Sequence, residues 1–204
     1  MNQIIANIKS RRSKRSFLDK SIPEEIIKDI IEAGRYAPSA LNKQPWKFIV
    51  ITDKDCIKKL SSVVKDITAK IAKFLPLLKL VKYTLRDPQT VAAIKKTISS
   101  DADTVFYNAP LLILIASDKK ESFACKDCAL ASQNMMLYAN SLGISSCFVG
   151  RAEILGMSKA AKDIIGLPPR HKIQSAVVFG YAAGGKDDSI VPERRRDNII
   201  NWVR

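Results

Sequence analysis

Four short apolar runs constrain this chain more than any other feature of its sequence. They cover Phe48 to Thr52, Leu111 to Ala116, Ser145 to Val149 and Ser175 to Gly180. Each run is bounded by polar residues, glycine or proline, which is the pattern of buried β-strands. Each is also far shorter than the roughly 20 apolar residues that a membrane-spanning helix needs. The sequence therefore predicts one sheet inside the protein and no membrane span.

Helical patterns of apolar residues occupy the intervals between these runs. From Pro23 onward isoleucines recur at helical spacing, the proline stands in the first turn, and Gly34 with Pro38 is expected to end the helix. A longer pattern runs from Cys125 to Leu142. This pattern fits either of two packed faces. One consists of Ala129, Met136 and Ala139, and the other consists of Leu130, Gln133 and Leu137. The sheet and the helices together indicate a mixed α and β architecture.

The composition gives no reason to divide the 204 residues, of which 47% are hydrophobic, into more than one domain. Within the predicted single domain, residues 1–204, the interval 54–103 is rich in lysine and contains an apolar stretch, Phe74 to Val81, that Pro76 interrupts. We predict that this interval is a helical insertion. If it covers the functional site, it would act as a lid that selects substrates.

The formal charge of +14 and the isoelectric point near 9.7 favour anionic partners without specifying one. Phosphate-bearing cofactors and nucleic acids both fit this charge, and the lysines between 54 and 96 also fit a solvated helix face. A nucleic-acid-binding module is an alternative, but no basic groove interleaved with aromatic residues and no helix-turn-helix pattern supports it. The N-terminus lacks the apolar stretch of a secretory signal, so we expect the protein in the cytoplasm.

Motifs for several other chemistries are missing or weak. The one histidine, His171, follows two prolines in a predicted loop and has no Gly-flanked serine to complete a hydrolase triad. Cys125 and Cys128 form a CxxC motif, but no second pair follows at zinc-ligand spacing. Packing within a helix is therefore the preferred interpretation, no metal site is expected, and all four cysteines are expected to be thiols. Neither a Walker motif nor a GxGxxG motif follows any predicted strand.

Three separated polar segments suit a flavin mononucleotide (FMN). The N-terminal segment combines arginines with Ser13, as a phosphate site requires, and an arginine run near the C-terminus adds further positive charge. The loop before the first strand carries Asn42 and Gln44, whose amides suit the edge of a flat heteroaromatic ring. From composition alone, a capped turn leading into the strand is the simpler explanation of residues 39–44.

Four segments, in this order, resemble the nitroreductase family of FMN-dependent oxidoreductases. The segments are RRSKRSF (11–17), APSALNKQPWKFIVI (37–51), DCALASQNMMLYANSLGISSCFVG (127–150) and FGYA (179–182). The resemblance covers nearly the whole chain and is loosest from Lys54 to Asp101. It implies an α+β fold with a central, mainly antiparallel sheet flanked by helices, in an intertwined homodimer whose FMN sites lie at the interface.

The resemblance also implies which residues bind FMN. Around the phosphate, the ribityl chain and the pyrimidine edge it places Arg11, Arg12, Ser13 and Arg15. Of these, Arg15 would support the negative charge of the reduced ring. The partner subunit would supply a loop that consists of Pro38, Ser39, Ala40, Asn42 and Gln44. The strand end against the ring would consist of Ser146, Cys147, Phe148 and Gly150. The phosphate site would be closed by Arg194 and Arg196.

The implied reaction is a ping-pong transfer in which NADH or NADPH reduces FMN and a nitroaromatic, quinone or related electron-poor acceptor then reoxidises it. No catalytic side chain is required. Ala182 follows Tyr181 where the family usually has proline, and Phe148 stands where an indole is frequent. Both departures are expected to affect the preference for an electron acceptor more than the binding of FMN. Flavin-binding or flavin-modifying proteins, and reductases of enones or carbon–halogen bonds, also resemble this family and are the alternatives.

Overall fold

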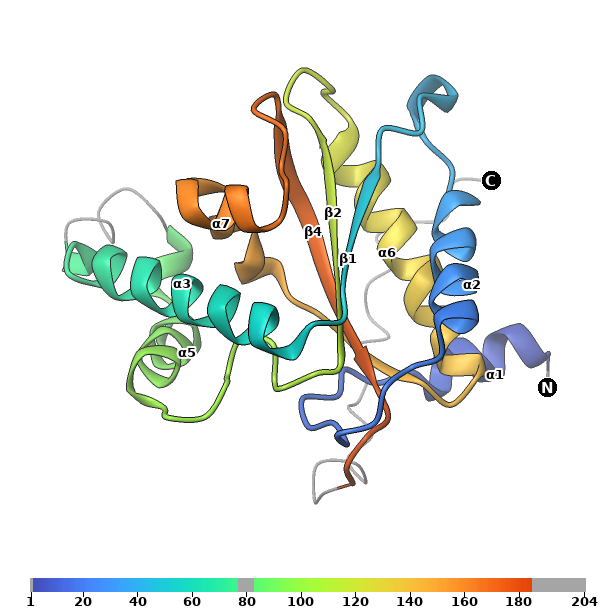
Figure 1. Cartoon of the computed structure of the whole chain (residues 1–204), viewed down its shortest axis with the longest axis horizontal. Coiled ribbons are helices and arrows are strands. Elements are labelled where there is room, and N and C mark those ends of the chain that lie inside the picture. Colours follow the sequence, from blue (N-terminus) through green and yellow to red (C-terminus); the bar gives the residue numbers. More distant parts are fainter. Residues whose placement is uncertain (1, 77–82, 185–204) are drawn as a thin grey trace, which may run out of the picture.

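The computed structural model describes residues 2–76 and 83–184. Four strands form one antiparallel sheet in the order β1-β2-β4-β3, which confirms the predicted sheet (Figure 1). The strands are β1 (Lys47–Ile51), β2 (Leu111–Asp118), β3 (Ser145–Phe148) and β4 (His171–Gly180). The α-helices are α1 (Gln3–Ser10), α2 (Glu24–Arg35), α3 (Lys54–Ala72), α5 (Pro88–Ser99), α6 (Ala124–Ser141) and α7 (Lys159–Ile164). The 3-10 helices are η1 (Ala40–Asn42), η2 (Tyr83–Arg86) and η3 (Gly150–Met157).

Strand β4 begins at His171, earlier than predicted, so this residue lies in the sheet and not in a loop. The first residues of β4 pair with the polar end of β2, across a register shift between Ile115 and Ala116. The buried side-chain amide of Gln174 donates to the Ser117 hydroxyl (2.6 Å), which satisfies polar groups inside the sheet. A search for apolar runs misses this end of β4, because polar residues can be buried there when they form hydrogen bonds with one another.

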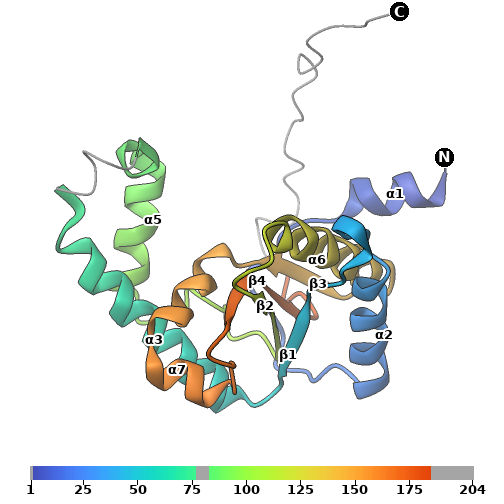
Figure 2. The ribbon, with the colours of Figure 1, turned by 90° about the horizontal axis from the view of Figure 1, so that it is seen from above.

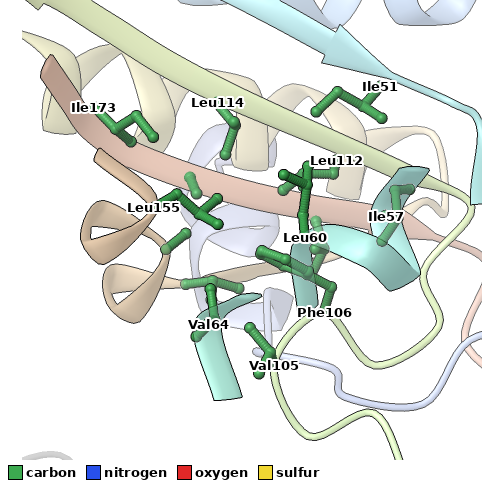
Figure 3. Close-up of a cluster of buried hydrophobic side chains, with 14 of the residues drawn as sticks. Ile51, Ile57, Leu60, Val64, Val105, Phe106, Leu112, Leu114, Leu155 and Ile173 are labelled. Carbon is green, nitrogen blue, oxygen red and sulfur yellow. The ribbon is translucent and has the colours of Figure 1, made fainter. Parts of the chain in front are cut away.

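Helices cover both faces of the sheet (Figure 2). α2 and α6 pack on one face, and α3, α7 and η3 pack on the other. Strand β2 contributes to both cores, with Leu111, Ile113 and Ile115 on the first face and Leu112 and Leu114 on the second. All five side chains are fully buried, which explains why β2 is a continuous apolar run in the sequence. Figure 3 shows the second of these cores.

A glycine sets the distance between α2 and α6. Helix α2 ends at Arg35, between Gly34 and Pro38 as predicted, but Gly34 itself is still helical. A Cβ on Gly34 would stand 2.8 Å from Cγ of Met135, which is closer than packed carbon atoms approach. The missing side chain therefore lets the two helices pack closely against each other.

The packed face of α6 also differs from both predicted faces. Ala129, Leu130 and Gln133 are exposed, although Met136 and Ala139 are buried as predicted. The buried positions of the helix are Ala124, Asp127, Cys128, Ala131, Ser132, Met135, Met136 and Ala139. Because α6 carries small or apolar residues on several sides, spacing alone does not select the face that packs.

Within the interval 54–103 the described residues form α3, η2 and α5, with non-helical residues after α3 and α5. The carboxylate of Asp53 caps α3 by accepting the Cys56 N–H (2.7 Å), and Asp87 caps α5 by accepting the Thr90 N–H (2.7 Å). Figure 1 shows the two helices extending away from the sheet beside α7. None of the helices within residues 2–76 and 83–184 combines the length and the apolar character needed to cross a membrane.

Candidate functional site

The N-terminal segment 11–17 lies along the end of the sheet where β3 and β4 meet. Ser13 forms a parallel bridge with Ser146 of β3, and the backbone N–H of the next residue, Lys14, donates a hydrogen bond to the Ser146 carbonyl (3.1 Å). Phe17 forms an antiparallel bridge with Ala182, just beyond β4. Backbone pairing thus brings together two sets of predicted site residues that are far apart in the sequence.

Gly180 allows this segment to approach the sheet. A Cβ at Gly180 would stand 2.8 Å from Cδ1 of Phe17 and 2.8 Å from Cδ of Pro110. Any larger residue would push the Phe17 ring away from β4. The close approach therefore depends on glycine at this position.

We define the N-terminal half-site as Arg11, Ser13, Arg15, Ser146 and Cys147. Nη1 of Arg11 and Oγ of Ser146 are buried, and neither has a hydrogen-bond partner within residues 2–76 and 83–184. Burial raises the pKa of the Cys147 thiol, although the positive charges of Arg15 and Arg11 act in the opposite direction. The half-site thus combines positive charge with unused polar groups, the combination that an anionic ligand with further polar atoms would satisfy.

Other predicted residues surround this half-site. Nη1 of Arg12 donates to the carbonyl groups of Lys9 (2.6 Å) and Arg11 (2.9 Å), so its side chain holds the end of α1. Phe148 ends β3 with 38% of its surface exposed, and Gly150 begins η3. Two further predicted residues, Arg194 and Arg196, lie outside the described part of the chain.

Sequence reasoning missed Tyr107, which joins the half-site from the loop before β2. Burial raises the pKa of Tyr107, so the phenol stays protonated, although the neighbouring positive charge of Arg15 acts in the opposite direction. Tyr107 and Asn108 have φ angles of 60° and 50°, in the left-handed region that residues other than glycine rarely adopt.

The Asp103 carboxylate holds the loop by accepting the Ser61 hydroxyl (2.6 Å) and three backbone N–H groups at 2.9, 3.0 and 3.1 Å. Asp103 was the only feature of the sequence that could have indicated this ordered loop, because an aspartate carboxylate often accepts hydrogen bonds from a turn that follows it.

The loop 38–44 lies at the N-terminal end of α6. The Lys43 ammonium group pairs with Glu121 (2.9 Å), just before that helix. The Ala40 N–H points at the carboxylate of Asp127 in the first turn of α6 (3.4 Å). The position of the loop is therefore fixed by α6 and by β1, which follows it.

Hydrogen bonds within the loop give it the capped turn that composition suggested. The Ser39 hydroxyl accepts the Gln44 N–H (2.9 Å), and the Gln44 side-chain amide donates to the Asn42 side chain (2.9 Å). Leu41, Asn42 and Gln44 all have left-handed φ angles (53°, 54° and 47°). Together with Pro38 these residues are exposed, Leu41 to 90%. The loop thus presents amide groups and one apolar side chain at the surface.

The structure does not bring this loop to the N-terminal half-site of the same chain. Lys47 at the start of β1 and Ile173 of β4 pair with the same residue of β2, so they lie at the same level of the sheet. Ser146 in the half-site pairs with Phe179 of the same strand. The two levels are six residues apart along β4, which corresponds to about 20 Å. Figure 1 shows the loop with η1 and the N-terminal segment at opposite ends of the sheet.

The CxxC motif lies on α6, with Cys125 exposed and Cys128 buried. Burial, together with the neighbouring charge of Asp127, raises the pKa of Cys128 to about 12. All four cysteines are free thiols. Within the described ranges, no group of histidine, cysteine, aspartate and glutamate side chains is arranged to hold a metal ion. The geometry therefore favours a packing role for Cys128 over a reactive dithiol.

An aromatic disulfide reagent at about pH 8 is expected to label Cys125 at least about 100-fold faster than Cys128, because the Cys128 thiol is buried and almost fully protonated. The release of the coloured thiol from the native protein measures both rates. Cys125→Ser should remove a fast phase that Cys128→Ser leaves intact. The opposite result, with the fast phase lost only in Cys128→Ser, would show that the buried thiol is the reactive one.

Comparison with known proteins identifies the family to which this fold belongs. Residues 8–181 match the nitroreductase family. The structure of a nitroreductase with bound FMN from Bacteroides fragilis is similar to this chain with a TM-score of 0.77 and 28% identity, covering 100% of both chains. A protein of Archaeoglobus fulgidus that carries the name NADH dehydrogenase/NAD(P)H nitroreductase is 29% identical over 192 residues, 92% of this chain and 90% of that protein. The chloronitrobenzene nitroreductase of Comamonas testosteroni is 25% identical over 196 residues, 86% of this chain and 85% of that protein. With its α+β fold and a family match over most of its length, the chain belongs to the nitroreductase family.

Proposed function

We propose that this nitroreductase-family oxidoreductase holds FMN between two copies of the chain and passes electrons from NADH or NADPH to nitroaromatics, quinones or related electron-poor acceptors. The observation that carries the proposal is the N-terminal half-site, where buried polar groups beside positive charge have no partner in the described chain. The relative with bound FMN supports the cofactor, and the name of the Archaeoglobus relative supports the reductant. The name of the Comamonas relative supports a nitroaromatic acceptor.

The residues of the half-site fit FMN in charge and in hydrogen bonding. Arg11 and Ser13 would bind its phosphate and ribityl chain, and the free Ser146 hydroxyl offers a further contact. When bound, FMN supplies the two-electron chemistry between NAD(P)H and the acceptor. Arg15 would place its positive charge where the reduced ring is negative, and the neighbouring Tyr107 hydroxyl would help to orient its guanidinium group. The chain thus contributes binding, orientation and electrostatic support.

The separation of the two predicted site segments supports a homodimer. Because the loop 38–44 lies about 20 Å along the sheet from the half-site of its own chain, a second copy would bring such a loop to the proposed FMN site more readily than its own chain. A site shared in this way would bind FMN only in the dimer.

Exposed apolar surface supports the same assembly. Helix α1 buries none of its residues, and its isoleucines Ile4, Ile5 and Ile8 are 70%, 44% and 45% exposed. A groove of about 590 Å³ runs between α1, α2 and α6 and includes Tyr36, which is 79% exposed. Contiguous apolar surface of this kind is stabilised when a second protein surface covers it.

The visible absorption spectrum of the purified protein, recorded without oxygen, tests the proposed function. We expect a flavin spectrum that bleaches on addition of NADH or NADPH and returns on addition of a quinone or nitroaromatic, because the half-site would hold FMN through both half-reactions. Bleaching without return would indicate a protein that stores or modifies flavin. A protein that stays colourless when FMN is added would contradict the proposal.

A further inference from the structure

A second cavity, of about 480 Å³, lies between α3, α5 and η3. Its wall is mainly apolar and includes Ile71, Leu75, Leu85, Ile94 and Ile154. Gly150, the residue at which η3 begins after β3, also lines it. The cavity therefore adjoins the strand end that we propose to lie against the flavin.

Arg151 is the one charged residue among the described residues that line this cavity. It donates to the hydroxyl of Thr97, a buried residue of α5 whose own proton goes to the Ala93 carbonyl (2.9 Å). Thr97 thus fixes the guanidinium group at the cavity wall. The positive charge of Arg151 also lowers the pKa of Tyr107, against the larger effect of burial.

No carboxylate within residues 2–76 and 83–184 forms an ion pair with Arg151, which is only partly exposed. A guanidinium group in such a position has several N–H donors beyond the one that Thr97 accepts. Apolar walls beside an unpaired cation complement a molecule with an apolar body and an oxygen atom that accepts hydrogen bonds and carries full or partial negative charge.

We propose that this cavity is the acceptor-selecting pocket, which binds the apolar substituent of a quinone while Arg151 donates hydrogen bonds to a quinone oxygen. This inference rests on the proposed function, because it assumes that the protein reduces an acceptor beside Gly150. Arg151 follows directly on Gly150 in the cavity wall, so a quinone whose substituent lies in the cavity would place its ring beside the strand end proposed to lie against the flavin. Each methylene group that enters the cavity should raise affinity about fourfold.

Binding of a redox-inert probe tests the cavity independently of turnover. We would titrate the purified holoenzyme with octanoate and with octanol by calorimetry. Ala93 lines the cavity from the exposed side of α5, and its neighbour Ala92 is exposed but does not line it. Ala93→Phe should weaken both ligands at least about 10-fold by filling the space, and Ala92→Phe should leave both unchanged. Equal binding to Ala93→Phe and the wild-type protein would overturn the proposal.

The same titration tests Arg151. Arg151→Met should weaken octanoate at least about 10-fold, because a charge-assisted hydrogen bond is lost, and should change octanol binding less than about threefold. Lys120→Met removes a positive charge at an exposed turn away from the cavity and should change neither. Equal losses for octanoate and octanol in Arg151→Met would contradict the assigned role of the guanidinium group.

A series of benzoquinones with methyl, butyl and octyl substituents connects the cavity to the acceptor. In Ala92→Phe and the wild-type protein, kcat/KM should rise with chain length, and in Ala93→Phe it should stay flat. If octanoate binds in the cavity but the wild-type series is flat, the cavity is not the acceptor pocket. If the wild-type protein reduces no quinone or nitroaromatic at all, the proposed function fails, and the titration still reports whether the cavity binds apolar anions.

Discussion

A mixed dimer made from two FMN-deficient variants is expected to bind one FMN with wild-type affinity. The first variant, Arg11→Ala with Arg15→Ala, damages the N-terminal half-site and should weaken FMN binding about 100-fold or more, because two charge-assisted contacts are lost. The second, Asn42→Ala with Gln44→Ala, damages the loop and should weaken binding about 10-fold or more. In the mixed dimer, one site combines the intact half-site of the second variant with the intact loop of the first. Differently tagged chains, purified in two steps and titrated with FMN by fluorescence, measure the affinity and the stoichiometry.

The matched control uses the same four substitutions in a different arrangement. When one chain carries all four and the other is wild-type, a shared site predicts no intact site, because each site receives one damaged segment. A site formed within a single chain predicts the reverse for both dimers: one intact site in this control and none in the mixed dimer of the two double variants. That reversed pattern would disprove the shared site.

The expectation follows from the register of the sheet. Pairing along β1, β2, β4 and β3 fixes the loop and the half-site about 20 Å apart in one chain. Both segments are also held by other contacts, the loop by the ion pair with Glu121 and the half-site by the bridge from Ser13 to Ser146 of β3. A movement that joined them within one chain would have to break these contacts.

The sheet was predictable because each of its four strands contains a short apolar run. A strand buried on both faces, such as β2, needs apolar side chains at every position, and that requirement is visible in the sequence. The start of β4 was not predictable, because Gln174 and Ser117 satisfy each other inside the sheet. The close contact of Gly34 with Met135 was equally hidden, since it depends on a neighbouring helix that local spacing does not identify.

For the site, composition indicated a basic and hydroxyl-rich segment at residues 11–15 and a polar loop at 38–44, and the family resemblance connected them to a flavin. Only the fold shows that Ser13 lies beside Ser146, because the bridge joins residues far apart in sequence. Tyr107 and Arg151 were missed because neither belongs to a motif. Each takes part through a contact made by the fold, with Arg15 in one case and Thr97 in the other.

Asp103→Ala is expected to lower the free energy of unfolding by about 3 to 5 kcal/mol. Oδ1 accepts the Ser61 hydroxyl and the N–H groups of Val105 and Phe106, and Oδ2 accepts the N–H of Asn108. Without the carboxylate, these donors lose their partner at a place where the Phe106 side chain is fully buried. The left-handed residues that follow also lose the group that holds them, so Tyr107 should no longer orient Arg15. Urea unfolding at saturating FMN measures the stability, and FMN titration measures the effect on the half-site.

Two further variants separate the role of the carboxylate from a general effect of charge. Asp103→Asn keeps the oxygen that accepts three of the four hydrogen bonds and loses only the acceptor for Asn108, so it should cost about 1 kcal/mol. Asp101→Ala removes the same charge two residues away, at an exposed position, and should change stability by less than about 0.5 kcal/mol. A graded loss from Asp101→Ala through Asp103→Asn to Asp103→Ala is therefore the signature of a carboxylate that organises the loop. If Asp103→Ala and Asp101→Ala unfold at the same urea concentration, the loop is held by its packing alone and the proposed support of Tyr107 by Asp103 is wrong.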